Sequence, residues 1–526
     1  MFFTMIKGLL VFRLSSLQTN VPHFYFLLII FLFGPKICFP QTLTKDPYLI
    51  EPGTSETTIR WEFDSKIESV LNYGLKDSMN ERKQAKLRAE KEGKFLYEVI
   101  LEDLKQGSQY FYQVSYGNEK SPMASFKTSS KNQSSFDFVA MGDSRSNPEI
   151  FASILENMKE NEPDLIISMG DLVARGGDMA EWDTYFFDVA GNVIDHIPLV
   201  STLGDHEGEN DEGELFRHFL RTDQSTEKQW FSFDFGEAHF ISLDYRHPNN
   251  SEMEEWFVHD ISSSDARWKF VYLHRPSYNL GGHRSTWGRD KWPELFSEHH
   301  VDIVFAGHSH IYERFYPMQQ LQDPDSWPVT YITTGGAGAG LYDVTQHGSL
   351  AVAESVNHFV YIEIKGKTLK LKAIRKDKSI MDELTIIKKG KGHDPAYNAL
   401  VQSQRSVNFL TSLSSKISID LNYVPFRDYT EPYVMTLNSI VAENVPFRIE
   451  LDESSAESYR MDPVEGILKA WEESKVKLEI YSKSENITIS NRGRMLPELR
   501  LKLEYTYDSI KEKIISKPAA YWPDVY

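Results

Sequence analysis

The chain has 526 residues, enough for about three and a half domains of average size, which excludes a single small module. Hydrophobic residues make up 41% of the chain and charged residues 25%, as in globular proteins. The net charge of −19 gives no basic footprint for nucleic acid or anionic lipid. Because there is only one cysteine, no thiolate zinc cluster can form, and any metal must be held by histidines and carboxylates.

The first 40 residues differ in composition from the rest of the chain. Lys7 and Arg13 precede an almost wholly apolar run over residues 24–34, which is too short to span a bilayer. The pattern predicts a signal peptide over residues 1–40 and an exported protein, periplasmic, cell-surface or extracellular, with no transmembrane span beyond the leader. Cys38 is either discarded with this leader or lipidated, and the residues before it form a poor lipobox.

Residues 42–130 show short alternating segments separated by turn residues. The predicted strands are Thr58–Phe63, Ser69–Gly74, Tyr97–Leu101 and Gln109–Ser115. Their alternation and spacing predict an N-terminal β-sandwich. Between the second and third of these strands, residues 76–94 are rich in Lys, Arg, Glu and Ala, and we expect a solvated helical insertion there.

From residue 136 to residue 388, apolar strands alternate with helical segments, which predicts a layered α/β domain. The expected strands are 136–141, 164–169, 198–203, 239–244, 269–274, 302–306 and 329–334, followed by closing strands at 358–364 and 368–373. A helix is expected over 148–160, because a proline stands at its start and apolar residues recur at helical spacing. After a linker at 388–393, residues 394–526 are predicted to form a β-rich domain of unknown role, with strands at 418–423 and 446–451.

Five of the expected strands end in the same kind of polar motif. These motifs are Gly142-Asp143-Ser144-Arg145, Gly170-Asp171-Leu172, Gly204-Asp205-His206-Glu207, Leu273-His274-Arg275 and Gly307-His308-Ser309-His310. Because ligand sites in α/β sheets form at the carboxyl ends of strands, we expect these side chains to converge. One such motif alone is more often an ordinary turn or a packed histidine, but five in succession indicate a site for hard or borderline divalent metals.

The order of these motifs resembles that of the calcineurin-like metallophosphoesterase superfamily. Within it, residues 273–283 and 307–314 are similar to purple acid phosphatases, and residues 101–112 are similar to their fibronectin type III-like N-terminal domain. The resemblance covers residues 42–388. It implies a layered metallophosphoesterase β-sandwich with flanking helices, preceded by an all-β domain and followed by the β-rich region.

The resemblance also implies two divalent or mixed-valence metal ions, Fe, Mn or Zn. Asp171 would bridge them, with Asp143 and His310 on the first metal. The residues implied for the second metal are Asp205, His274 and His308. His206 would act at the leaving group as general acid or charge stabiliser, and His283 would be a second substrate-facing histidine.

Three positions depart from the family pattern. Arg145 replaces a histidine of the superfamily, Ala174 replaces the tyrosine of purple phosphatases, and Asp205 replaces an asparagine. The first metal is thus left with three evident protein ligands, and no tyrosinate is available to colour an iron. Arg145 either clamps a phosphate oxygen or pairs with an acidic neighbour, and its position favours the clamp.

Two further loops border the expected site. The acidic loop 207–214 is predicted to be solvated, with an additional cation site as the alternative. The glycine-rich segment 335–340 lacks the Lys-Ser/Thr of a nucleotide loop and is expected to be a flexible loop near the site.

The resemblance implies acid phosphatase-like hydrolysis of phosphoric monoesters, on phosphorylated small molecules or phosphoproteins, by direct attack of a metal-bound hydroxide. A phosphodiesterase on the same dinuclear site is one alternative. A surface binding protein with a degraded phosphoesterase site is the other, suggested by Arg145 and Ala174. The sequence gives no indication of oligomeric state.

Overall fold

The computed structural model describes most of the chain after residue 41. The described residues are 42–208, 212–221, 228–320, 323, 325–345, 350–401, 433–439, 445–457, 459–468, 474–482, 488–490, 493–495, 499–507, 510–517 and 521–522. The predicted signal peptide and the strand expected at 418–423 lie outside these residues. Among the helices within them, none is long and apolar enough to cross a membrane.

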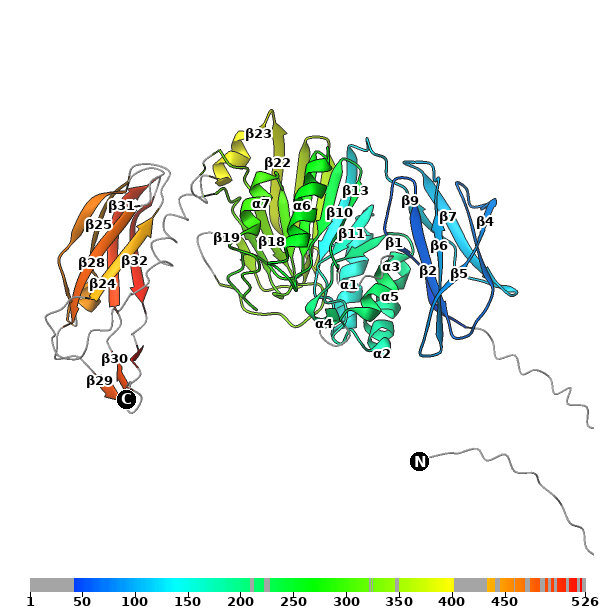
Figure 1. Cartoon of the computed structure of the whole chain (residues 1–526), viewed down its shortest axis with the longest axis horizontal. Helices are drawn as coiled ribbons and strands as arrows, with labels where there is room; N and C mark the ends of the chain where they lie inside the picture. The colour runs from blue at the N-terminus through cyan, green and yellow to red at the C-terminus, as the bar shows by residue number, and fades with distance from the viewer. Residues whose placement is uncertain are drawn as a thin grey trace, which may run out of the picture. The chain divides into compact units, whose positions relative to one another are not determined.

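The N-terminal domain is a β-sandwich, as predicted (Figure 1). One sheet has the order β1-β2-β6-β5, and the other has the order β4-β3-β7-β8 with β9 paired to β7. The strands are β1 (Leu43–Ile50), β2 (Thr57–Phe63), β3 (Ser69–Gly74), β4 (Glu81–Gln84), β5 (Lys86–Lys91), β6 (Lys94–Leu101), β7 (Gln109–Tyr116), β8 (Glu119–Lys120) and β9 (Ala124–Lys127). Trp61 and Val99 of the first sheet pack with Leu71 and Val114 of the second in one apolar core.

The helical insertion expected at 76–94 is wrong, because this stretch forms β4 and β5. Each of the two strands lies at the edge of a sheet, with β4 beside β3 and β5 beside β6. Their side chains are mostly exposed, so neither strand shows the buried and exposed alternation that reveals a strand in a sequence. Lysine-rich composition is typical of edge strands, where charge prevents pairing with another chain.

The α/β domain contains two seven-stranded sheets, with the orders β12-β11-β10-β20-β21-β22-β23 and β13-β14-β15-β16-β18-β17-β19. The first sheet is formed by β10 (Ser135–Met141), β11 (Leu165–Ser168), β12 (Leu199–Ser201), β20 (His358–Lys365), β21 (Thr368–Arg375), β22 (Ile380–Lys389) and β23 (Gly392–His393). The second is formed by β13 (Phe231–Phe235), β14 (Ala238–Ser242), β15 (Trp268–Leu273), β16 (Ile303–Ala306), β17 (Tyr312–Phe315), β18 (Thr330–Thr334) and β19 (Leu350–Glu354). All nine strands predicted for this domain are confirmed.

The two sheets pack face to face, and helices cover their outer faces. Phe138 of the first sheet contacts Phe240, Phe270 and Phe305 of the second, with ring centroids 5.1 to 6.3 Å apart. The helical segments are α1 (Pro148–Lys159), α2 (Met179–Glu181), the π-helical η1 (Trp182–Phe187), α3 (Asp188–Ile194), α4 (Asp205–Gly208), α5 (Glu214–Leu220), α6 (Ser251–Ser263) and α7 (Trp292–Glu298). The predicted layered α/β domain, with two packed sheets and flanking helices, is therefore confirmed.

The linker expected at 388–393 is a β-hairpin in the structure. Lys388 pairs with His393, and Lys389 pairs with Gly392, around a turn with Gly390 at φ 59°. Tyr397 and Val401, in the helical residues that follow, belong to the apolar core between the two sheets. The Lys-Gly alternation was typical of a linker, but glycine with positive φ also closes a tight hairpin.

The described C-terminal residues are β-rich, as predicted. They form three sheets with the orders β24-β28-β26, β27-β25-β31-β32 and β29-β30-β33. The strands are β24 (Tyr433–Ser439), β25 (Val445–Leu451), β26 (Tyr459–Met461), β27 (Val464–Leu468), β28 (Ser474–Ser482), β29 (Thr488–Ser490), β30 (Gly493–Met495), β31 (Leu499–Tyr507), β32 (Ile510–Lys517) and β33 (Tyr521–Trp522), with a 3-10 turn, η2 (Glu453–Ser455). The strand expected at 446–451 lies within β25.

Candidate metal centre

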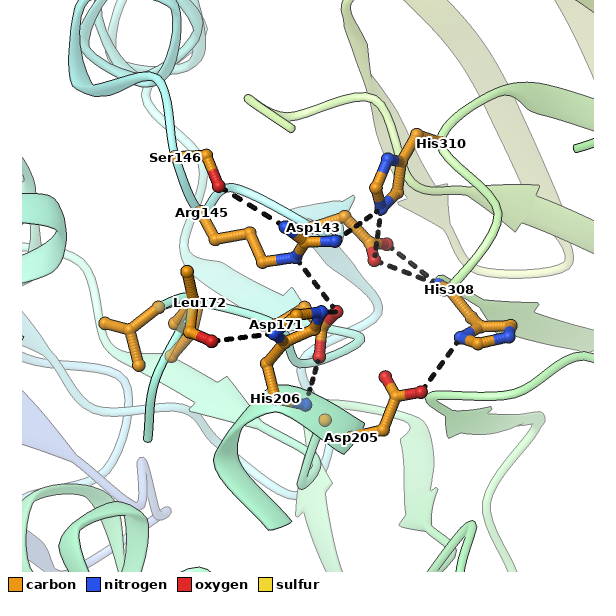
Figure 2. Close-up of polar contacts among 12 residues, drawn as sticks. Asp143, Arg145, Ser146, Asp171, Leu172, Asp205, His206, His308 and His310 are labelled. Atoms are coloured by element: carbon orange, nitrogen blue, oxygen red, sulfur yellow. Dashed lines mark hydrogen bonds and ion pairs between the residues drawn. The ribbon is translucent and has the colours of Figure 1, made fainter. Parts of the chain in front are cut away.

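The polar motifs at the strand ends converge into two neighbouring groups of side chains (Figure 2). The first group is Asp143, Asp171 and His310; the second is Asp205, His274 and His308. Within each group, one potential ligand atom per residue lies within 4.8 Å of the others, and all six residues are buried. The structure therefore brings together every residue that the sequence suggested as a metal ligand.

The backbone at three of these six positions is left-handed. Asp143 has φ 60°, Asp171 has φ 56° and His308 has φ 65°. Residues other than glycine rarely adopt this conformation, and when they do they cluster at functional sites. The peptide N–H of His308 also donates to the Asp143 carboxylate, at 2.9 and 3.2 Å, which ties the ends of β10 and β16 together.

Close packing of the strand-end loops explains why glycines precede the aspartates. A Cβ added at Gly170, which has φ 83°, would lie 2.5 Å from the nitrogen of Gly204. A Cβ added at Gly204 would lie 2.2 Å from the nitrogen of Asp171. The two loops therefore meet backbone to backbone, and a side chain at either glycine would separate Asp171 from Asp205.

Backbone carbonyls fix the orientation of two candidate histidine ligands. The Nδ1 atom of His274 lies 2.7 Å from the carbonyl oxygen of Met169, and Nδ1 of His310 lies 2.6 Å from that of Gly340. A carbonyl oxygen only accepts hydrogen bonds, so each Nδ1 carries the proton. Each Nε2 lone pair is thereby left for a cation, which is the usual arrangement of metal-binding histidines.

The electrostatics of the cluster favour positive charge. Burial raises the pKa of Asp171, and the neighbouring carboxylates of Asp143 and Asp205 raise it further. Burial alone would lower the pKa of His274, but Asp171 and Asp205 outweigh it and raise that pKa to about 10. Buried carboxylates that favour protonated imidazoles nearby also attract divalent cations. Protons and metal ions compete for the same nitrogen and oxygen atoms. The donor set therefore fits a pair of divalent metals.

Glu207 holds together the backbone of the two loops that carry Asp171 and Asp205. The sequence did not reveal this role. The buried carboxylate of Glu207 accepts the backbone N–H groups of Asp171 (2.9 Å), Leu172 (2.7 Å), Val173 (3.1 Å) and Gly204 (3.0 Å). Burial raises the pKa of Glu207 to about 8, and the charge of Asp171 adds to this. The prediction of a solvated loop from 207 onward is thus wrong at its first residue, because these bonds join segments far apart in the sequence.

Arg145 lies beside the first group. Its Nε is 3.3 Å from Oδ2 of Asp171, its Nη2 is 3.4 Å from Nε2 of His310, and its Nη1 donates to Ser146 (Figure 2). The arginine therefore pairs with a candidate ligand and faces the site.

His206 stands in α4, next to Asp205 in the chain and in contact with Asp171. Its peptide N–H donates to Oδ1 of Asp171 at 3.0 Å, and its Nδ1 lies 2.7 Å from the carbonyl oxygen of Ala174. The side chain is 30% exposed, so the imidazole is fixed on one side and open to solvent on the other.

His283 lies over the second group. Its ring stacks on that of His308 with centroids 4.6 Å apart, and its peptide N–H donates to Oγ of Ser309 at 3.1 Å. The buried carboxylate of Glu313 holds this loop by accepting the N–H groups of Leu280 and Gly281. Partial burial and His308 lower the pKa of His283.

The glycine-rich segment 335–340 forms a wall of the site, near it as predicted. It is not a loose loop, because Ala337 donates its N–H to Gly142 and Ala339 donates its N–H to Asp143, at 3.1 and 2.8 Å. Residues 335–339 are buried. Small residues here let the backbone pack against the strand-end loop that carries Asp143.

Arg275, which stands in the fourth strand-end motif without a predicted role, contacts the second group. Its Nη2 donates to Oδ2 of Asp205 at 2.7 Å, and Nδ1 of His308 lies 3.2 Å from the same oxygen. The other Asp205 oxygen contacts Nε2 of His274. Burial alone would raise the pKa of Asp205, but the hydrogen bonds from His274 and His308 hold it well below its usual range.

Known proteins similar to this chain are consistent with such a site. Residues 136–312 match the calcineurin-like phosphoesterase family, and residues 48–128 match the purple acid phosphatase N-terminal domain. The chain is 28% identical over 305 residues to purple acid phosphatase 22 of Arabidopsis thaliana, covering 52% of this chain and 67% of that protein. It is 24% identical over 314 residues to a phosphoenolpyruvate phosphatase of Allium cepa, covering 52% and 65% of the two chains.

Among solved structures, a purple acid phosphatase from yellow lupin seeds (Lupinus luteus) shares the fold, with a TM-score of 0.58 and 18% identity. The alignment covers 65% of this chain and 74% of the lupin chain. The chain thus carries a calcineurin-like phosphoesterase domain. It is preceded by a purple acid phosphatase N-terminal domain, and its relatives include several purple acid phosphatases. The resemblance found in the sequence is confirmed for these two domains.

Proposed function

We propose that this chain is a metal-dependent phosphatase that hydrolyses phosphoric monoesters of small molecules or proteins after export. The observation that carries the proposal is the pair of buried Asp/His groups at the carboxyl ends of strands from both sheets. Two divalent cations, when bound at such a site, activate water and neutralise charge on a phosphoryl group. The similarity to purple acid phosphatase 22 and to the phosphoenolpyruvate phosphatase supports the same reaction.

We assign the two groups to two metals, with Asp171 shared between them. Asp171 belongs to the first group, yet its Oδ1 lies 3.4 Å from Nε2 of His274 in the second. A carboxylate that belongs to the first group and also approaches a member of the second could serve both metals. Asp143 and His310 would complete the first site, and the remaining members of the second group would complete the second.

We assign the acid role to His206. Its Nδ1 proton is held by the Ala174 carbonyl, so Nε2 is the nitrogen that can give a proton to the leaving oxygen or stabilise its charge. His283 is exposed above the second group, where it can contact the ester. Arg145, with a guanidinium beside the first group, can hold a phosphoryl oxygen once a metal competes for Asp171.

The alternative of a surface binding protein with a degraded site receives no support from the geometry, since all six candidate ligands are buried and grouped. A phosphodiesterase would use the same groups, and the two esters are separated by experiment. The purified full-length chain, stripped with a chelator and reloaded with Mn, Zn or Fe, is assayed on an aryl phosphate monoester and its diester. We expect metal-dependent monoester turnover that exceeds diester turnover. Faster turnover of the diester would overturn the monoester assignment. No turnover of either ester after metal reloading would overturn the proposed enzymatic activity.

A further inference from the structure

Asp205 adds a third carboxylate to a site that has to bind an anion. Asp143 and Asp171 are already present in the first group, and all three are buried. Three carboxylates cancel most of the charge of two divalent cations, which weakens the attraction for a phosphoryl dianion. Asparagine, which the family pattern places at this position, would not have this effect. A compensating cation next to Asp205 would restore the attraction.

Arg275 is placed to supply that charge. It follows β15, one residue after His274, and its Nη2 lies 2.7 Å from Asp205 Oδ2. The guanidinium carbon lies 5.2 Å from the ring centroid of Tyr245, which in turn packs edge-on against His274. The Arg275 side chain is therefore held by contacts with the Tyr245 ring and the Asp205 carboxylate.

The contact with Asp205 engages only part of the Arg275 guanidinium. The buried Nε of Arg275 has no hydrogen-bond partner among the residues that the structure describes, and the side chain is 41% exposed. An arginine used only to fix Asp205 would be expected to direct both arms of its fork at the carboxylate, as Arg267 does with Glu237. Arg275 directs only one arm at Asp205, so fixing that carboxylate does not account for the whole guanidinium.

We propose that Arg275 compensates the charge of Asp205 and thereby sustains the affinity of the metal centre for phosphate. The inference rests on the proposed phosphatase function. It assigns to Arg275 the part of a positioning residue, which acts through Asp205 and through the potential of the site.

The test is calorimetric titration of the metal-loaded full-length chain with inorganic phosphate, preceded by elemental analysis of every variant. Arg275→Gln should weaken phosphate binding about tenfold while keeping the metal content of the wild type. Arg275→Lys, which keeps the charge, should remain within about threefold of the wild type. The double variant Asp205→Asn/Arg275→Gln removes both charges and should recover most of the lost affinity. Arg267→Gln, at the other end of β15, is the matched control and should have no effect.

Three results would overturn the proposal. They are an unchanged phosphate affinity in Arg275→Gln, a double variant weaker than Arg275→Gln alone, or loss of metal from Arg275→Gln, because removal of a nearby cation should not weaken metal binding. If instead the reloaded wild type holds no metal, the proposed function itself fails, and the charge compensation fails with it.

Discussion

The Nδ1 atom of His206 lies 2.7 Å from the backbone carbonyl oxygen of Ala174, the position where purple phosphatases carry a tyrosine. The contact uses the backbone of residue 174 and not its side chain. The chain therefore orients His206 without needing a tyrosine at that position. Under the proposed ligand assignment, the absence of that tyrosine affects only the first metal site.

The visible spectrum of the iron-loaded protein should show the absence of a tyrosine at position 174. We expect the iron-loaded wild type to lack a tyrosinate charge-transfer band, because Ala174 supplies no phenolate. Ala174→Tyr should gain the band while retaining the contact of His206. Visible absorption spectra of the two proteins at equal iron content are the measurement. A strong visible band in the wild type would show that another tyrosine ligates the iron.

Replacement of His206 should reduce turnover without removing metal. In His206→Asn we expect kcat to fall about a hundredfold or more, since proton donation to the leaving group is lost. The loss should be larger for an alkyl phosphate than for an aryl phosphate, whose leaving group needs less help. Steady-state kinetics with both esters measures this, with His259→Asn on the exposed face of α6 as control. An equal loss on both esters would argue against the acid role.

Glu207→Gln should destabilise the protein. The carboxylate accepts four backbone N–H groups, two on each oxygen, and the amide nitrogen of glutamine cannot accept. We expect a loss of about 2 kcal/mol or more in unfolding free energy, since buried donors are left unpaired. Urea unfolding compares the variant with the wild type, and Glu214→Gln, an exposed glutamate of α5, is the control. Equal stability of Glu207→Gln and the wild type would contradict the supporting role.

His239 predicts a pH dependence of stability away from the metal centre. Its Nδ1 lies 2.7 Å from Asp234 and its Nε2 lies 2.8 Å from Asp260, with Lys269 opposite in register on β15. Burial alone would lower the pKa of His239, but the two carboxylates outweigh it and raise the pKa to about 9. Because the folded pKa exceeds the unfolded value of about 6.5, the stabilisation is complete below pH 6.5 or so and is lost as pH rises through about 9.

The test compares the wild type with His239→Gln. The difference in Tm should be largest near pH 6 and should shrink by about pH 10, and contributions from Lys269 cancel in the comparison. Thermal unfolding followed by circular dichroism gives both values. A Tm difference that stays constant over this range would contradict the charged state of His239.

The sequence predicted the elements whose signal is local. The strand before Asp143 ends in the apolar run Phe138–Met141, and the strand before His308 is wholly apolar; a glycine follows each, and both the strands and their convergence are confirmed. By contrast, β4 and β5 are exposed edge strands whose charged composition resembles that of a helix. Their structure depends on pairing with β3 and β6, which composition alone does not encode.

The roles of three residues near the site could not be predicted, for a different reason. Glu207, Arg275 and Glu313 act by contacting backbone or side chains from segments distant in the sequence. Charged residues of this kind are usually solvated, so nothing in their local pattern distinguishes them. Only Arg275 had a sequence signal of its own. It directly follows the candidate ligand His274, and Asp205 adds a negative charge for which an arginine could compensate.

The most direct test of the dinuclear centre is elemental analysis of the purified wild type beside His308→Ala. We expect about two divalent-metal equivalents per wild-type chain, and loss of at least one equivalent together with turnover in the variant, with unchanged circular dichroism. A wild-type chain that holds no metal and still hydrolyses an aryl phosphate, or a His308→Ala variant with full metal content and activity, would contradict the account.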